Sequence, residues 1–216
     1  MRHDIIKYYI NYIVRIYMGI ETARTGKLLY HITSIDNLDS IITHGLISRS
    51  KVSEKELTFD DIADPEIIHK RGRLGLDNYV PFHFHPYSAF DVAVKNRYNA
   101  KNMMYLCISR TLARENGFKI LPKHPLSGEE YYLYDYDEGF ALIDWDTMTN
   151  LNQNDRYARE VRMAECLTDK IIPIKAFTCI FVANEEAKNI VIEKMRRINF
   201  PPPYININQT WFDGYD

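Results

Sequence analysis

The stretch KLLYHITSIDNLDSIITHGLISRS, residues 27–50, decides the fold because it predicts a strand that runs straight into a helix. Residues 27–32 are apolar and extended. Thr33 follows them and can cap the helix, with Asp36 in the position of a capping-box acid. Gly45 then ends the helix. Apolar residues at helical spacing give it a buried stripe, which consists of Ile35, Leu38, Ile41 and Ile42.

His31 lies at this junction, between Tyr30 and Ile32, where neither packing nor turn chemistry requires a histidine. A lone histidine beside an apolar strand is more often a hydrogen-bonded core group than a catalyst. Its place just before a helix start favours a ligand site, because free backbone N–H groups point there. The residues alone leave both interpretations open.

The totals describe one globular domain with a substantial core, since 46% of the 216 residues are hydrophobic. The formal charge of −2 gives no general attraction to nucleic acid, so such binding must rest on a local patch. Three cysteines without metal or disulfide spacing suggest a reducing cytoplasm. Strands dominate and helices separate them irregularly, which favours an α+β fold.

The other elements are read from local patterns. Pro81 argues that its strand lies at a sheet edge or carries a bulge. The stretch 48–78 is polar, and the stretches 122–138 and 149–159 are expected to be loops. Strands are expected at 78–84, 102–110, 160–167, 174–184 and 204–212, and a helix at 185–197.

The N-terminal run IIKYYINYIVRIYMGI, residues 5–20, predicts a helix with a polar stripe on one face. We expect it to pack on the domain or on a partner, with binding at a membrane surface as the alternative. It is too short and too interrupted to span a bilayer and has no signal-peptide cleavage site. The division expected is a helical extension, 1–26, and a main domain, 27–216.

Glu165 is a candidate functional carboxylate. If residues 160–167 form a strand, Glu165 shares a face with Val161, Met163 and Leu167, where a charge is costly unless it is paired or functional. One interpretation is a strand-end residue that reaches solvent or pairs with an arginine. The other is a carboxylate of raised pKa that acts as a base or an anchor.

Two groups of basic residues could bind phosphate. Arg71 and Arg73 lie in IIHKRGR, residues 67–73, which is either a solvated loop or a clamp for a diphosphate. A second group has the composition needed to bind single-stranded nucleic acid, with positive charge for the phosphates and an aromatic ring for a base. Its members are Arg156, Tyr157, Arg159 and Arg162. The alternative is that this group is merely part of a soluble loop.

Several other site types find no support in the sequence. His83 and His85 form an H-x-H pair without an evident third ligand, so we expect no metal. There is no Gly-rich phosphate loop and no GxSxG motif, so a nucleotide would have to be held in another way.

Motifs along the chain resemble a known family. LLYHITSIDNLDSIITHGLIS resembles the opening YHITHIDNL of the DarT-like DNA ADP-ribosyltransferase toxins, which is followed by a helix ending in G-L. The match continues at NYVPFHFHPYS, LIDWDTM, RMAECLT and YININQTWFDGY, in the family's order, over roughly residues 28–215.

The resemblance implies an α+β fold with an ADP-ribosyltransferase-like split two-sheet β core and flanking helices. It implies an NAD-dependent transferase that needs no metal and that attaches ADP-ribose to thymine or guanine in single-stranded DNA. It also implies a cytoplasmic toxin, without membrane contact, whose macrodomain antitoxin reverses the modification.

The resemblance also assigns residues. Glu165 falls on the catalytic glutamate, and Arg71 aligns best with the catalytic arginine, which also contacts NAD, although Arg73 remains an alternative. The stretch 149–162 corresponds to the substrate-recognition loop, which puts Arg156, Tyr157, Arg159 and Arg162 on the DNA. The NAD-binding segment comprises His31, Thr33, Asp36 and Asn37.

Two departures leave the modified base open. The family's Pro-Arg-Ser is Pro86-Tyr87-Ser88 here, and AFDVAV replaces the usual P-M-L-Y. Two other functions also stay open: a non-catalytic module that binds single-stranded nucleic acid, and the same NAD chemistry on RNA or protein.

Overall fold

The computed structural model describes residues 20–98, 100–124, 130–150, 152 and 155–212. The helix expected over residues 5–20 therefore lies, apart from Ile20, outside the described residues.

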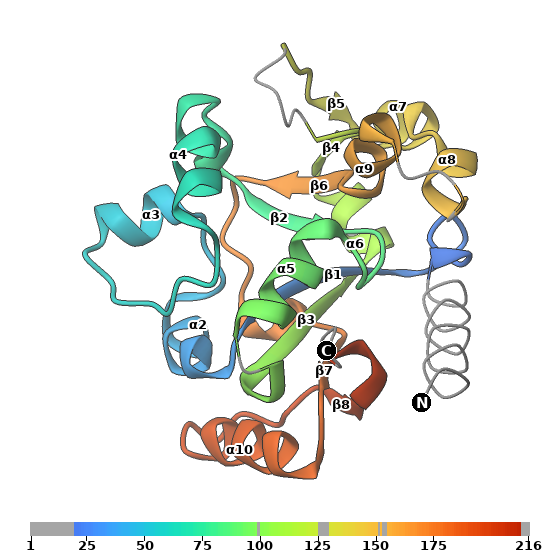
Figure 1. Ribbon diagram of the computed structural model, residues 1–216. Helices are drawn as coiled ribbons and strands as arrows, with labels where there is room; N and C mark the ends of the chain where they lie inside the picture. Colours follow the sequence, from blue (N-terminus) through green and yellow to red (C-terminus); the bar gives the residue numbers. More distant parts are fainter. Residues whose placement is uncertain (1–19, 99, 125–129, 151, 153–154, 213–216) are drawn as a thin grey trace, which may run out of the picture.

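The described strands form a single sheet, in the order β5-β4-β6-β2-β1-β3-β7-β8 (Figure 1). All neighbours are antiparallel except β7 and β8, which are parallel. The strands are β1 (Leu28–Ser34), β2 (Val80–His83), β3 (Met103–Ser109), β4 (Lys119–Leu121), β5 (Tyr134–Asp135), β6 (Glu165–Thr168), β7 (Cys179–Val182) and β8 (Tyr204–Ile207).

The sheet has a weak seam in its middle. Strands β1 and β3 pair at seven consecutive positions, whereas β1 and β2 pair at one, Tyr30 with His83. The α+β class is confirmed, and the split that we expected between two sheets is this seam within one sheet. The edge position expected for Pro81 is wrong, because β2 lies between β6 and β1. The seam still explains the proline, since Pro81 has no N–H to donate to a ladder.

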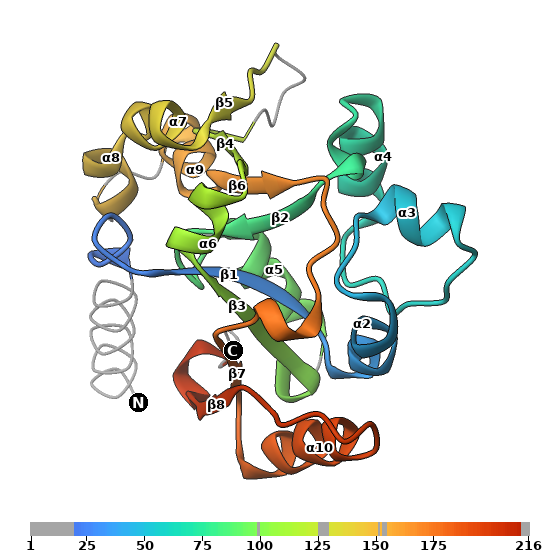
Figure 2. The ribbon, with the colours of Figure 1, turned by 180° about the vertical axis from the view of Figure 1, so that it is seen from behind.

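The helices surround the sheet on several sides. Helix α5 covers one face and α6 the other, while α2, α3 and α4 gather at one end and α7, α8 and α9 at the other (Figures 1 and 2). Helix α10 packs beside β8. Their bounds are α2 (Leu38–His44), α3 (Arg49–Glu54), α4 (Pro65–Arg73), α5 (Ala89–Arg97), α6 (Arg110–Glu115), α7 (Tyr136–Leu142), α8 (Trp145–Thr149), α9 (Arg156–Arg162) and α10 (Glu185–Arg196).

Polar stretches that suggested loops contain helices, so the loops expected over 122–138 and 149–159 are partly wrong. Helix α7 begins within the first, and α9 begins in the second and runs to Arg162. The stretch 48–78 contains α3 and α4. These helices bury few apolar residues, and the starts of α3, α4 and α9 depend on side-chain caps, whereas α7 has no such cap. The cap oxygens of Ser48, Asp64 and Asp155 accept backbone N–H groups of α3, α4 and α9.

Two further local expectations need correction. Residues 160–163 end a helix, so the strand begins only at Glu165. The cap after β1 is Ser34, not the expected Thr33. The Oγ of Ser34 accepts a hydrogen bond from the backbone N–H of Asp36 at 3.2 Å. The helix itself is confirmed, because Gly45 ends it at φ +78° after a buried stripe.

The two faces of the β2–β6–β4 half differ in character. Phe82, Cys166 and Ile120 share one face and belong to the main hydrophobic core. Their neighbours His83 and Glu165 are cross-strand partners and point to the opposite face. This register brings polar side chains together at one end of the half-sheet.

Helix α7 packs closely on β4, and this packing can be tested by a substitution at Gly139. A Cβ at Gly139 would lie 2.4 Å from Cβ of Ile120, so Gly139→Ala is expected to lower the free energy of unfolding by roughly 1–3 kcal/mol. Gly72→Ala is the control, because nothing lies within 4 Å of its Cβ position. Urea unfolding of both variants measures the difference, and equal stabilities would contradict the packing described.

Candidate active site

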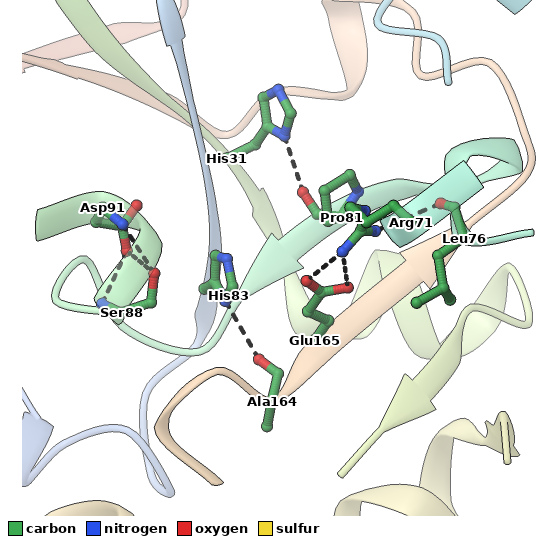
Figure 3. Close-up of polar contacts among 9 residues, drawn as sticks. All are labelled: His31, Arg71, Leu76, Pro81, His83, Ser88, Asp91, Ala164 and Glu165. Carbon is green, nitrogen blue, oxygen red and sulfur yellow. Dashed lines mark hydrogen bonds and ion pairs between the residues drawn. The ribbon is translucent and has the colours of Figure 1, made fainter. Parts of the chain in front are cut away.

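An ion pair between Arg71 and Glu165 is the central feature of the site (Figure 3). Arg71 Nη1 donates to Oε1 of Glu165 at 2.7 Å and to Oε2 at 3.0 Å. Its Nη2 lies 3.4 Å from the Leu76 carbonyl oxygen, which helps to orient the guanidinium. The Glu165 side chain is 3% exposed and that of Arg71 13%. Each of these buried charges stabilises the other, because burying either one without its partner would cost folding free energy.

The pKa of Glu165 is lowered, so the interpretation as a carboxylate of raised pKa is wrong, and the alternative, that Glu165 pairs with an arginine, is the one the structure shows. Burial acts to raise it, but the charge of Arg71, followed by His124 and His83, and the Arg71 hydrogen bond outweigh burial. The expectation failed because Arg71 lies 94 positions away and no strand pattern reveals that contact. Glu165 is therefore a carboxylate at neutral pH.

His31 occupies the seam between β1 and β2. Its Nδ1 donates to the Pro81 carbonyl oxygen at 2.8 Å, because a carbonyl can only accept (Figure 3). Burial lowers the pKa of His31 to about 4, so the ring is neutral and Nε2 is left as an acceptor. His31 thus fills the gap that the single-pair seam opens beside Pro81.

A cavity of about 150 Å³ lies against these residues. His31, Thr33, Asn37, Arg71 and His83 all line it, together with parts of α2 and α3. The amide of Asn37 donates to Thr33 Oγ1 at 3.1 Å and accepts from the Asp60 N–H at 2.7 Å, which fixes one wall.

Glu165 itself does not line this cavity and is joined to its wall through Arg71. Asp36 and the alternative arginine, Arg73, also lie outside the cavity. Asp36 is exposed. Arg73 is also exposed, and among the described residues Arg71 is the arginine bonded to Glu165.

His124 is a residue that the sequence analysis missed. It is 6% exposed, and neither ring nitrogen has a hydrogen-bond partner within the described part of the chain. Its charge state influences Glu165, and burial lowers the pKa of His124 itself. No local motif marks it, because it reaches the site only through the pairing of β4 with β6.

Comparison with known proteins decides the family. Residues 30–213 match the family described as "ssDNA thymidine ADP-ribosyltransferase, DarT". The chain belongs to the DarT family. It is therefore classed as an ADP-ribosyltransferase that uses NAD, and the resemblance seen in the sequence is confirmed.

Among relatives, the DNA ADP-ribosyl transferase of Thermus sp. strain 2.9 is 25% identical over 85% of this chain and 95% of its own. A DNA ADP-ribosyl transferase–DNA ADP-ribosyl glycohydrolase fusion protein of Thermosipho africanus is 23% identical over 80% of this chain. The chain spans about half of that fusion protein, 47% of its length.

Solved structures of Thermus sp. 2.9 DarT share the fold. The complex with ADP-ribosylated ssDNA superposes with a TM-score of 0.74 at 22% identity, over 87% of this chain and 96% of that one. The NAD+ complex gives 0.69 at 20% identity, over 87% and 98%.

In this DarT-family chain the four residues expected on DNA lie on α9, directly before Glu165, and outside the first cavity. Tyr157 and Arg159 are exposed. Arg156 pairs with Glu160 at 2.8 Å, and Arg162 Nη2 donates to the Asn150 carbonyl oxygen at 2.5 Å. Helix α9 is thus an exposed basic surface with part of its charge bonded within the protein.

No group of three or more His, Cys, Asp or Glu residues that could hold a metal ion occurs within the described ranges. In the same ranges, no helix is long and apolar enough to cross a membrane.

Replacement of Arg71 should lower the free energy of unfolding by an amount that depends on pH. Arg71→Ala leaves the Glu165 carboxylate buried and unpaired, which is expected to lower the free energy of unfolding by roughly 3–5 kcal/mol at pH 7. Because the folded-state pKa of Glu165 is lowered, the pair stabilises the protein above the unfolded pKa. That contribution disappears as the pH falls through the folded pKa, so the difference between variant and wild type should shrink toward acid.

Urea unfolding from pH 7 to below pH 4, where the pH passes below the usual pKa of a glutamate, measures this difference. Arg197→Ala removes an exposed ion pair with Glu193 and serves as the control, with stability close to wild type expected. A difference for Arg71→Ala that is absent at pH 7, or that grows toward acid, would contradict the pairing.

Proposed function

We propose that this chain transfers ADP-ribose from NAD to a nucleobase, thymine or guanine, in single-stranded DNA. The observation that supports this most is the buried Arg71–Glu165 pair beside a cavity lined by His31 and Asn37. The wall of this cavity then offers a cation for the diphosphate and hydrogen-bonding groups, and the carboxylate of Glu165 is bonded to that cation. Membership of the DarT family supports the same reaction.

The reaction needs a negative charge where positive charge develops. The bond between nicotinamide and ribose C1′ breaks, neutral nicotinamide leaves, and the ribose becomes oxocarbenium-like. Glu165 is suited to stabilise that cation because its lowered pKa keeps it ionised. A nitrogen of the base then bonds to C1′ and loses its proton to a base or to water. The lowered pKa favours the electrostatic role of Glu165 over a role as that base.

The other residues hold the co-substrate. Arg71 would pair with the diphosphate of NAD, a geometry for which a guanidinium is well suited. Neutral His31, with Nε2 free to accept, would bind a ribose hydroxyl or the carboxamide N–H of NAD. Thr33 and Asn37 would complete the segment, with Asp36 at its exposed end.

A single strand is the expected substrate because a base inside a duplex cannot reach a carboxylate that is 3% exposed. The residues of α9 that we assign to the DNA are Arg156, Tyr157, Arg159 and Arg162, with the arginines on the phosphates and the tyrosine ring on a base. Transfer to RNA or protein, or binding without catalysis, are outcomes of the test below.

We further propose that the chain is the toxin of a toxin–antitoxin system and acts in the cytoplasm. Modified DNA bases would block replication, so a partner that removes ADP-ribose is needed, and a macrodomain antitoxin would supply it. The Thermosipho relative carries a transferase and a glycohydrolase in one chain, which supports this pairing.

Reaction with NAD and a panel of mixed-sequence oligonucleotides is the direct test. Mass spectrometry is expected to show addition of one ADP-ribose to DNA, and Glu165→Gln should reduce the rate about 100-fold or more. Glu193→Gln, an exposed ion-paired glutamate on α10, should react like wild type. If DNA, RNA and protein all remain unmodified, the proposed function is wrong.

Expression in bacteria tests the toxin role separately. Growth should stop on induction, and it should recover with Glu165→Ala or with a co-expressed macrodomain glycohydrolase. Equal toxicity of the wild type and the variant at equal protein levels would show that the chemistry is not responsible.

A further inference from the structure

A second cavity, of about 350 Å³, opens beside the start of β6 and shares no lining residue with the first, although Tyr157 on its wall is one of the residues assigned to the DNA. Leu121 lines it and is the cross-strand partner of Glu165. Val161 lines it as well, four residues before Glu165 and within the helix that leads to this strand. The wall of the second cavity therefore includes the residue that is paired with Glu165 across the sheet.

Tyrosines dominate its walls, which include Tyr131, Tyr132, Tyr134 and Tyr157. Tyr132 is 65% exposed and Tyr157 is 48% exposed, so two large aromatic rings lie outside the hydrophobic core. The hydroxyl of Tyr157 is held by Asp144 Oδ2 at 3.2 Å, which fixes its ring. Exposed rings at the mouth of a cavity offer flat surfaces on which a base can stack.

The charges around the second cavity are mixed, with Lys123 as the cation on its wall and Glu130 and Asp144 as the carboxylates. Lys123 Nζ lies 5.9 Å from the centroid of the Tyr157 ring and can meet a phosphate at the mouth. Arg159 is exposed on α9, on the same helix as Tyr157. The lining carboxylate of Asp144 is engaged, since it also accepts from the backbone and hydroxyl of Thr147. Glu130 is the other acidic lining residue.

The second cavity is connected to the catalytic pair. The Tyr131 hydroxyl donates to the carbonyl oxygen of Leu74, the residue that caps α4. Arg71 lies three residues earlier on that helix. One wall of the second cavity is therefore fixed to the element that positions Arg71.

We propose that the second cavity binds the nucleobase next to the modified one, stacked on Tyr132 and Tyr157, with Lys123 on the adjoining phosphate. The inference rests on the proposed function, because it needs a DNA strand at Glu165. A DNA strand with its target base at Glu165 must place a neighbouring nucleotide nearby, and this cavity, whose wall includes the cross-strand partner of Glu165, offers rings and a cation for it. The neighbouring base thus becomes part of substrate recognition.

Abasic oligonucleotides test the proposal. With wild-type protein, removal of one particular neighbouring base is expected to lower kcat/KM for DNA roughly 5- to 150-fold. The double variant Tyr132→Ala/Tyr157→Ala should show a similar loss on the intact strand and no further loss on the abasic strand. Its KM for NAD should stay at the wild-type value, and its kcat/KM on the abasic strand should equal that of wild type, which a partly unfolded variant would not reach.

Tyr204→Ala is the matched control, because Tyr204 is 72% exposed but lies on β8, at the far edge of the sheet. It should show the full abasic penalty. The same penalty in the double variant as in wild type, or no penalty in wild type, would overturn the proposal.

A binding measurement separates this inference from the proposed function. 2-Aminopurine at the neighbouring position should lose fluorescence on binding to Glu165→Gln protein, and less so when both tyrosines are also replaced. If no transfer to DNA occurs but this difference is seen, the proposed function fails while the cavity still binds a base. If transfer occurs and the two proteins give the same fluorescence, the cavity proposal alone is wrong.

Discussion

The buried pair of Arg71 and Glu165 is the interaction on which the site depends. Two opposite charges are held at 2.7 Å with little solvent, and burying either charge without the other would be costly. Their contact joins α4 to β6 and so fixes a helix that buries little apolar surface of its own. Stability and chemistry are therefore coupled, because the group that keeps Glu165 ionised also closes one side of the NAD cavity that we propose.

The seam of the sheet explains why a site can form at its centre. Strands β1 and β2 pair at one position, and Pro81 cannot donate a ladder hydrogen bond there. The ring of His31 donates a hydrogen bond to the carbonyl oxygen of Pro81. Both residues line the first cavity. A histidine placed just before a helix start is thus a structural part of the seam as well as a candidate ligand.

Much of the fold could be predicted from residues 27–50 and from apolar alternation, and the DarT resemblance located His31, Arg71 and Glu165. The helices in polar stretches could not, because single caps such as Asp64 and Asp155 start them and not an apolar stripe. The direction in which the pKa of Glu165 shifts could not be predicted from the sequence for a related reason. Its direction depends on contacts across the sequence, with Arg71 and His124, that only the folded chain creates.

The most direct measurement is a crystal structure of this chain with a non-hydrolysable NAD analogue. The account predicts the dinucleotide in the cavity lined by His31 and Asn37, its diphosphate bonded to Arg71 and its nicotinamide ribose within hydrogen-bond reach of Glu165. An analogue bound elsewhere, with Glu165 and Arg71 still joined and no ribose beside them, would contradict it.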